Sequence, residues 1–161
     1  MKKMGLAAAS MVLAAVFGWA APAAANTSEG YITGAGTPTD DFNDEGTLST
    51  TSHSSSTAVM LWQEILVTHG YLTNADLDCR FGSKTKTATQ NFQRLAGLSD
   101  DGVVGPKTFA AAGRFLTISS DNWVTYTSTI GRTWSWYRDP GNHRYKDFNT
   151  YYFSYTSTTC W

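Results

Sequence analysis

The chain has 161 residues, with 12 Lys and Arg against 13 Asp and Glu and a formal net charge of −1. This length allows one compact domain or two small ones. Binding to nucleic acid normally requires a basic surface, so the near balance of charge argues against a nucleic-acid partner.

The first 25 residues have the three parts of a secretory signal peptide. Lys2 and Lys3 form a positive start, residues 6–16 are apolar, and residues 23–25 form an A-x-A cleavage site. The apolar run is too short and too rich in alanine for a stable membrane span. We therefore expect an exported mature chain with no integral membrane segment.

Residues 26–57 are predicted to form a flexible tether. They are rich in Ser, Thr and Gly, and they carry an acidic patch at Asp40, Asp41, Asp44 and Glu45. Few apolar side chains are present to offset the entropy that ordering the segment would lose.

A helical domain is predicted over residues 58–115. Apolar residues recur at three- and four-residue spacing from Val59 to Leu66, Thr57 can cap this first helix, and Gly70 is placed to end it.

A second helix is expected from about Ser83 to Ala96 and a third from Pro106 to Gly113. Short connections between three short helices indicate a bundle with a small core. The predicted core residues are Trp62, Leu66, Phe81, Phe92, Leu95, Leu98, Val104 and Phe109.

One phrase, D-x-x-[F/V]-G-x-K-T, occurs at residues 78–85 and again at 101–108, and each copy opens a helical pattern. Together with Leu61-Trp62-Gln63, Asn91-Phe92-Gln93 and the stretch 98–108, it resembles the peptidoglycan-binding domain-1 family over about residues 57–115. The resemblance implies a three-helix wall-binding module with a shallow groove for the glycan or the stem peptide of peptidoglycan.

The loops at the two helix starts are where we expect ligand contacts. The candidate residues are Asp78, Arg80, Asp101 and Thr108. The alternative is structural, because each aspartate could simply accept hydrogen bonds from the amides of its own turn.

The two cysteines, Cys79 and Cys160, are predicted to pair, because an even number of cysteines in an exported chain favours a disulfide. Closing so long a loop would contribute on the order of 4 kcal/mol in the chain-entropy model. Two reduced cysteines remain the alternative. Cys79 stands where the second repeat has Gly102, and where the family commonly has glycine.

Residues 117–161 hold twelve of the 22 aromatic residues and show the period-two alternation of strands, with turn residues at 139–142. We expect a three- or four-stranded antiparallel β extension packed on the helices, which makes the fold class α+β. Aromatic rings can stack on sugar faces, although most rings in a short sheet are core or cross-strand partners. The rings considered are Trp123, Trp134, Trp136 and Tyr137, with Trp134 and Trp136 retained as candidate ligand contacts.

No catalytic set of residues is recognised. His53, His69 and His143 are scattered, and no metal-ligand spacing or G-x-S-x-G motif is present. Sequence spacing does not pair the carboxylates as glycoside hydrolysis requires, and Cys160 lacks a local histidine. We expect neither an enzyme nor a bound cofactor or metal.

The sequence therefore predicts a secreted, monomeric, wall-associated protein that binds peptidoglycan without cleaving it. One alternative is a cell-wall hydrolase whose active site lies in the β extension, with Asp139, His143 or Asp147 as catalytic residues. Another is a module that binds a second secreted protein through that extension.

Overall fold

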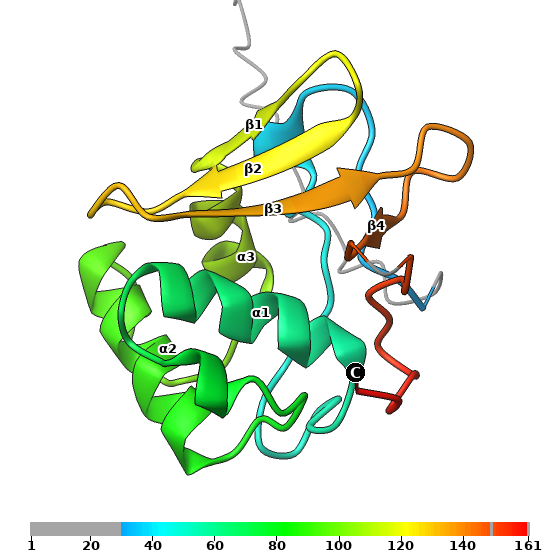
Figure 1. Ribbon diagram of the computed structural model, residues 1–161. Coiled ribbons are helices and arrows are strands. Elements are labelled where there is room, and N and C mark those ends of the chain that lie inside the picture. Colours follow the sequence, from blue (N-terminus) through cyan, green and yellow to red (C-terminus); the bar gives the residue numbers. More distant parts are fainter. Residues whose placement is uncertain (1–29, 149, 161) are drawn as a thin grey trace, which may run out of the picture.

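The folded part of the chain has two layers, one of helices and one of strands (Figure 1). The computed structural model describes residues 30–148 and 150–160. The signal peptide predicted at residues 1–25 lies outside the described residues. Three helices and a four-stranded antiparallel sheet in the described ranges confirm the predicted α+β class.

The helices and strands follow one another along the chain with short connections. The helices are α1 (Thr57–Thr68), α2 (Ser83–Leu95) and α3 (Pro106–Gly113), with the short 3-10 helices η2 (Pro38–Asp40) and η3 (Asn74–Asp76). The strands are β1 (Leu116–Ile118), β2 (Trp123–Thr127), β3 (Thr133–Arg138) and β4 (Tyr145–Lys146).

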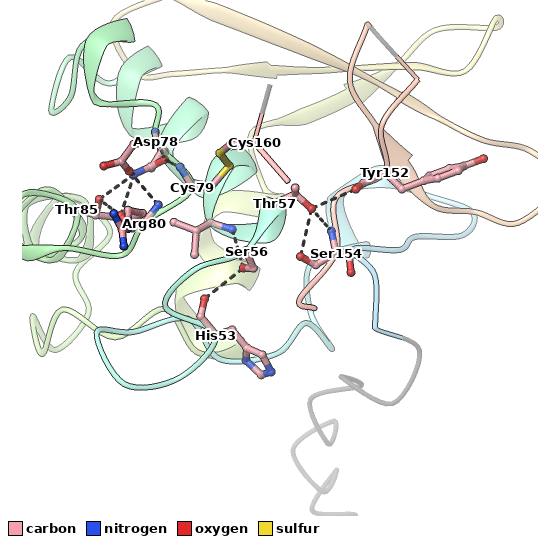
Figure 2. Close-up of a disulfide and its surroundings, with 12 residues drawn as sticks. His53, Ser56, Thr57, Asp78, Cys79, Arg80, Thr85, Tyr152, Ser154 and Cys160 are labelled. Carbon is pink, nitrogen blue, oxygen red and sulfur yellow. Dashed lines mark hydrogen bonds between the residues drawn. A yellow bond between two sulfur atoms is a disulfide. The ribbon is translucent and has the colours of Figure 1, made fainter. Parts of the chain in front are cut away.

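Helix α1 is the centre of the fold, because it contacts α2 on one side and β3 on another. Eleven of its twelve residues are buried. Ser56 caps it by accepting the Val59 amide at 3.3 Å, one residue before the predicted cap at Thr57. The Thr57 hydroxyl instead accepts the amide of Ser154 at 2.7 Å, which ties the helix start to the end of the chain (Figure 2).

The core of the helical layer is built around Trp62. Its ring makes edge contacts with Phe92 and Phe109, with centroids 5.2 and 5.6 Å apart. Its Nε1 donates to the Thr89 hydroxyl at 2.9 Å, so the buried indole is fully satisfied. These contacts join all three helices.

The predicted core is confirmed except at Leu95 and Leu98. Leu95 is 45% exposed and Leu98 is only partly buried. The buried face of α2 runs through Ala88, Thr89 and Phe92. At about 100° per residue, Leu95 falls on the flank of this face and points to solvent.

The sheet has the order β1-β2-β3-β4, which confirms the expected antiparallel extension. Val124 pairs with Trp136 and Tyr126 with Trp134. Ile130 lies in the β2–β3 turn and is 58% exposed. Residues 150–156 contribute single bridges rather than a further strand.

The flexible tether predicted over residues 26–57 is wrong for the described part of that segment. Ile32, Phe42 and Leu48 are fully buried. The Phe42 ring lies 5.8 Å from Phe109 and 5.6 Å from Tyr145. A segment with few apolar residues and no periodicity can still pack on the core through a small number of side chains. The composition of residues 26–57 therefore did not predict this packing.

Two carboxylates of the predicted acidic patch are also buried. Asp41 accepts from Arg138 Nη1 at 2.7 Å and from the Tyr145 hydroxyl, and burial raises its pKa to about 6. Glu45 accepts the Tyr155 hydroxyl at 2.7 Å, and burial raises its pKa to about 8. These bonds hold residues 30–57 against the C-terminal part of the chain.

The predicted disulfide between Cys79 and Cys160 is confirmed (Figure 2). It joins the first repeat to the end of the chain, with the two Cα atoms 6.1 Å apart. Cys79 has φ 58° and its counterpart Gly102 has φ 73°. A left-handed backbone is strained for any residue with a Cβ, so the cysteine occupies a position suited to glycine.

Cys160→Ser is expected to lower the free energy of unfolding by about 4 kcal/mol, because it opens a loop with a sequence separation of 81. Adding Cys79→Gly should recover about 1 kcal/mol, since glycine adopts positive φ without strain. Urea unfolding followed by tryptophan fluorescence measures both effects. Wild type in dithiothreitol should match Cys160→Ser, and a double variant no more stable than the single one would contradict the strain at Cys79.

Candidate functional site

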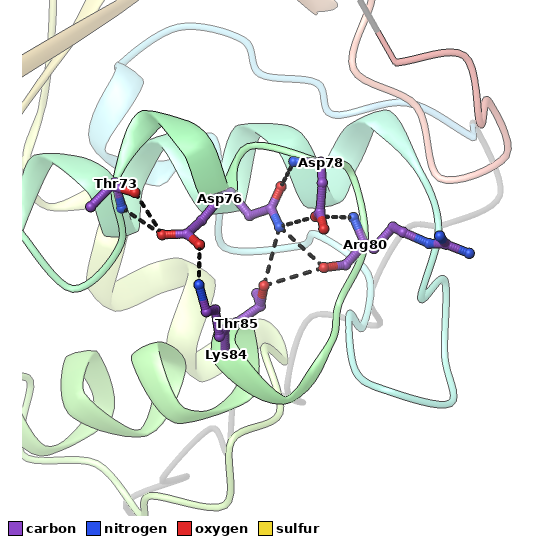
Figure 3. A network of polar contacts seen from close by, with 7 residues as sticks. Thr73, Asp76, Asp78, Arg80, Lys84 and Thr85 are labelled. Atoms are coloured by element: carbon purple, nitrogen blue, oxygen red, sulfur yellow. Dashed lines mark hydrogen bonds and ion pairs between the residues drawn. The ribbon is translucent and has the colours of Figure 1, made fainter.

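Each repeat forms a corner in which a loop enters a helix, and a glutamine holds each corner together. Figure 3 shows Asp78, Arg80 and Thr85 of the first corner. Gln63 of α1 donates through Nε2 to Asp78 Oδ1 at 2.8 Å and to Thr85 Oγ1 at 3.1 Å. The same nitrogen lies 3.1 Å from the Arg80 carbonyl, and Gln63 Oε1 accepts the Cys79 amide at 3.0 Å. One side chain thus links α1, the loop and the first turn of α2.

The second corner repeats these contacts with Gln93 of α2. Gln93 Nε2 donates to Asp101 Oδ1 at 2.8 Å and to Thr108 Oγ1 at 3.1 Å. It also reaches the Val103 carbonyl at 2.9 Å, while Oε1 accepts the Gly102 amide at 2.8 Å. The repeated sequence therefore encodes a repeated polar clamp.

Three of the predicted ligand contacts belong to these clamps. Asp78 Oδ1 also accepts the Arg80 amide at 2.9 Å, and Asp101 Oδ1 accepts the Val103 amide at 2.8 Å. Thr108 is buried, with its hydroxyl engaged inside the corner. The structural interpretation therefore accounts for Asp78, Asp101 and Thr108, and ligand contact at these residues stays a prediction.

Arg80 differs from them, because its exposed side chain points away from the clamp (Figure 3). Its guanidinium has no hydrogen-bond or ion-pair partner among the described residues. It lines a cavity of about 380 Å³ at the first corner. Lys84, which lines the same cavity, is paired with Asp76 at 2.7 Å.

The second corner has a cavity of about 560 Å³ in the corresponding position. Leu98 and Pro106 give it apolar walls, and the exposed Lys107 lies at its edge. Both corners thus combine a concave surface with a cationic side chain. This arrangement suits a ligand that carries carboxylates and a hydrated backbone.

The two retained tryptophans occupy different environments. Trp136 is fully buried, so its prediction as a sugar-stacking ring is wrong. Its position opposite Val124 turns the ring toward α1, where Nε1 donates to Glu64 Oε2 at 2.6 Å. Trp134 is only partly buried and lines a cavity, so contact with a ligand stays a prediction for this ring.

Glu64 is a further polar residue of the structure that no sequence motif indicates. It is 4% exposed and lines the same cavity as Asp147. Burial, and secondarily the charge of Asp147, raises the pKa of Glu64 to about 8. From its place beside Gln63 on a helix, Glu64 would be expected to face solvent. Contact between α1 and the sheet buries it instead.

The other residues named for a hydrolase lie elsewhere. Asp139 and His143 belong to the turn between β3 and β4, where the His143 amide donates to the Asp139 carbonyl at 2.7 Å. Within the described ranges, no group of three metal-binding side chains occurs. In the same part of the chain, none of the helices combines the length and the apolar character needed to cross a bilayer.

Comparison with known proteins identifies the helical layer. Residues 55–112 match the family described as "Putative peptidoglycan binding domain". The chain is also 54% identical over 35 residues to a Kitasatospora aureofaciens protein described as "Uncharacterized protein in bpoA1 3'region". That match covers 22% of this chain and 30% of the relative. No solved structure matches the chain.

Gln93→Met is expected to destabilise the protein by about 2–4 kcal/mol, because the Gly102 amide and its neighbours lose their buried partner. Gln90→Met, on the same helix, removes one exposed bond to the Asp100 carbonyl and should change stability by less than about 1 kcal/mol. Urea unfolding measures both. Equal losses in the two variants would contradict a structural role for the clamp.

Stability is expected to fall as pH rises from about 5 to 8 through the contribution of Glu64. Its folded pKa of about 8 lies above the ordinary 4.5, so the folded chain keeps a proton that the unfolded chain has lost. Glu64→Gln should therefore make the free energy of unfolding fall less steeply than in wild type, by up to about 1.4 kcal/mol per pH unit.

Other buried groups titrate in the same range but are present in both proteins. Asp41 and Glu45 act in the same direction as Glu64, while burial of His69 lowers its pKa to about 4 and acts in the opposite direction below pH 6.5. The difference between wild type and Glu64→Gln isolates Glu64. Parallel pH profiles from urea unfolding would show that Glu64 ionises normally in the folded chain.

Proposed function

We propose that this chain, which carries a peptidoglycan-binding domain at residues 55–112, is an exported protein that attaches to the bacterial cell wall and does not cleave it. The family match is the observation that carries the proposal. The disulfide supports an extracytoplasmic location, because such bonds persist in oxidising compartments.

The two corners are the proposed contact surface. Each has a concave floor held by a glutamine clamp and a cationic side chain at its edge, Arg80 in one and Lys107 in the other. A stem peptide presents carboxylates and backbone amides, which these groups can bind. Because each hydrogen bond to a hydrated ligand contributes only about 0.5–1.5 kcal/mol, attachment depends on several contacts together.

Hydrolysis is the competing function, and one observation favours it. Glu64 and Asp147 line one cavity, which brings together two carboxyl groups that sequence spacing left apart. Glycoside cleavage uses two carboxyl groups, one of them with a raised pKa, and burial raises the pKa of Glu64 to about 8. An assay for soluble products distinguishes attachment from cleavage.

Purified protein mixed with sacculi is expected to sediment with them and to release neither reducing ends nor peptides. Arg80→Ala should weaken retention about 5- to 10-fold, because it removes a charged hydrogen-bond donor from the first corner. Arg114→Ala is the matched control, since Arg114 is an exposed arginine that lines neither corner cavity. Failure of wild type to sediment would refute wall attachment, and equal losses in both variants would refute the corner as its site.

A further inference from the structure

A third concave site lies between the two layers, apart from the corner cavities. It has a volume of about 320 Å³. Helix α1, the η3 region, strand β3 and the segment after β4 all contribute to its walls. Its lining residues are Met60, Glu64, Asn74, Leu77, Trp134, Asp147 and Phe148.

Glu64 brings an incompletely satisfied carboxyl group to this cavity. The side chain is more than nine-tenths buried, and Oε2 accepts the Trp136 indole N–H at 2.6 Å. Among residues 30–148 and 150–160, no donor reaches Oε1. Because Glu64 lines the cavity, this oxygen offers a hydrogen-bonding position for a ligand atom or water.

Aromatic rings form the more apolar part of the wall. Phe148 is 68% exposed, although its ring stacks on Trp123 with the centroids 5.1 Å apart. Trp134 contributes a second, half-buried ring. A phenylalanine held by stacking and still exposed offers a flat apolar surface that can cover the C–H face of a sugar.

We propose that this cavity is a saccharide-binding cleft, in which Phe148 and Trp134 contact the sugar face and Glu64, Asn74 and Asp147 bind its hydroxyl and amide groups. Within the described chain, no Lys, Arg or His lines the cavity, which disfavours an anionic ligand. Carboxyl and amide groups together supply both donors and acceptors, as a neutral polyhydroxylated ligand requires. The volume lies near the lower end of ligand pockets, roughly 300–1,000 Å³, and suits a short saccharide segment.

The proposal deepens the proposed function and rests on it for the natural ligand, the glycan of the wall. The cleft extends beyond the family match, which ends at residue 112, because Trp134, Asp147 and Phe148 follow that boundary. The cleft adjoins the first corner through η3, since Asn74 lines the cleft while Ala75 and Asp76 line the corner cavity. Glycan and stem peptide thus have neighbouring sites.

Calorimetric titration of the purified protein with a tetramer of N-acetylglucosamine tests the cleft. Wild type should bind, and Phe148→Ala should weaken binding about 5- to 10-fold through loss of ring contact. Tyr151→Ala is the matched control, since Tyr151 is also half exposed in the same tail but does not line the cavity. It should bind as wild type does.

Absence of binding, or equal weakening in both variants, overturns the cleft. Sedimentation with sacculi is measured in parallel, so that loss of the cleft is distinguishable from failure of wall attachment. Release of reducing ends that Glu64→Gln abolishes would also overturn the proposal, because the site would then be catalytic. Tetramer binding with the expected difference between Phe148→Ala and Tyr151→Ala, and without product release, supports it.

Discussion

The burial of α1 on two sides is the constraint on which the rest of the structure depends. Consecutive residues of a helix point about 100° apart, so a helix enclosed by two layers must direct neighbours into different environments. Gln63 points to the first repeat and completes its clamp, whereas Glu64 points to the sheet and meets Trp136. Two adjacent polar residues are thereby buried, and each requires partners from another part of the chain.

The helical domain and its flanking segments form one packed unit. Phe42 from the N-terminal segment contacts Phe109 of α3 and Tyr145 of β4, and the Cys79–Cys160 bond ties the first repeat to the end of the chain. A three-helix bundle of this size has a small core of its own. The sheet and the N-terminal segment enlarge that core. Strand β3 and the segment after β4 also supply part of the wall of the cavity that contains Glu64.

The two repeats show how one local pattern serves both stability and the candidate surface. An aromatic residue followed by glutamine occurs in α1 as Trp62-Gln63 and in α2 as Phe92-Gln93. In each pair the ring enters the core while the amide holds the next loop, so packing and loop shape are coupled. One carboxylate oxygen of each aspartate, Asp78 Oδ1 and Asp101 Oδ1, belongs to the clamp, whereas the cationic side chains of Arg80 and Lys107 lie outside it.

The amino-acid sequence by itself determined the features that depend on near neighbours. Helical periodicity, the proline at the start of α3, the duplicated turn and the strand alternation predicted the helices and sheet, and an even cysteine count predicted the disulfide. The aromatic–glutamine pairs were visible as well, although their role was not. Each of these signals is either a pattern among residues close together in the sequence or the number of residues of one type.

The tertiary structure alone decided which polar and aromatic groups are buried. The buried residues Ile32, Phe42 and Leu48 follow neither helical nor strand periodicity in the sequence. Trp134 and Trp136 are equivalent in the sequence, and only the packing of the sheet on α1 buries Trp136 fully. Glu64 and Asp147 belong to one cavity only because the chain folds back over α1. Burial and the resulting pKa depend on contacts between residues far apart in the sequence, and no local pattern encodes those contacts.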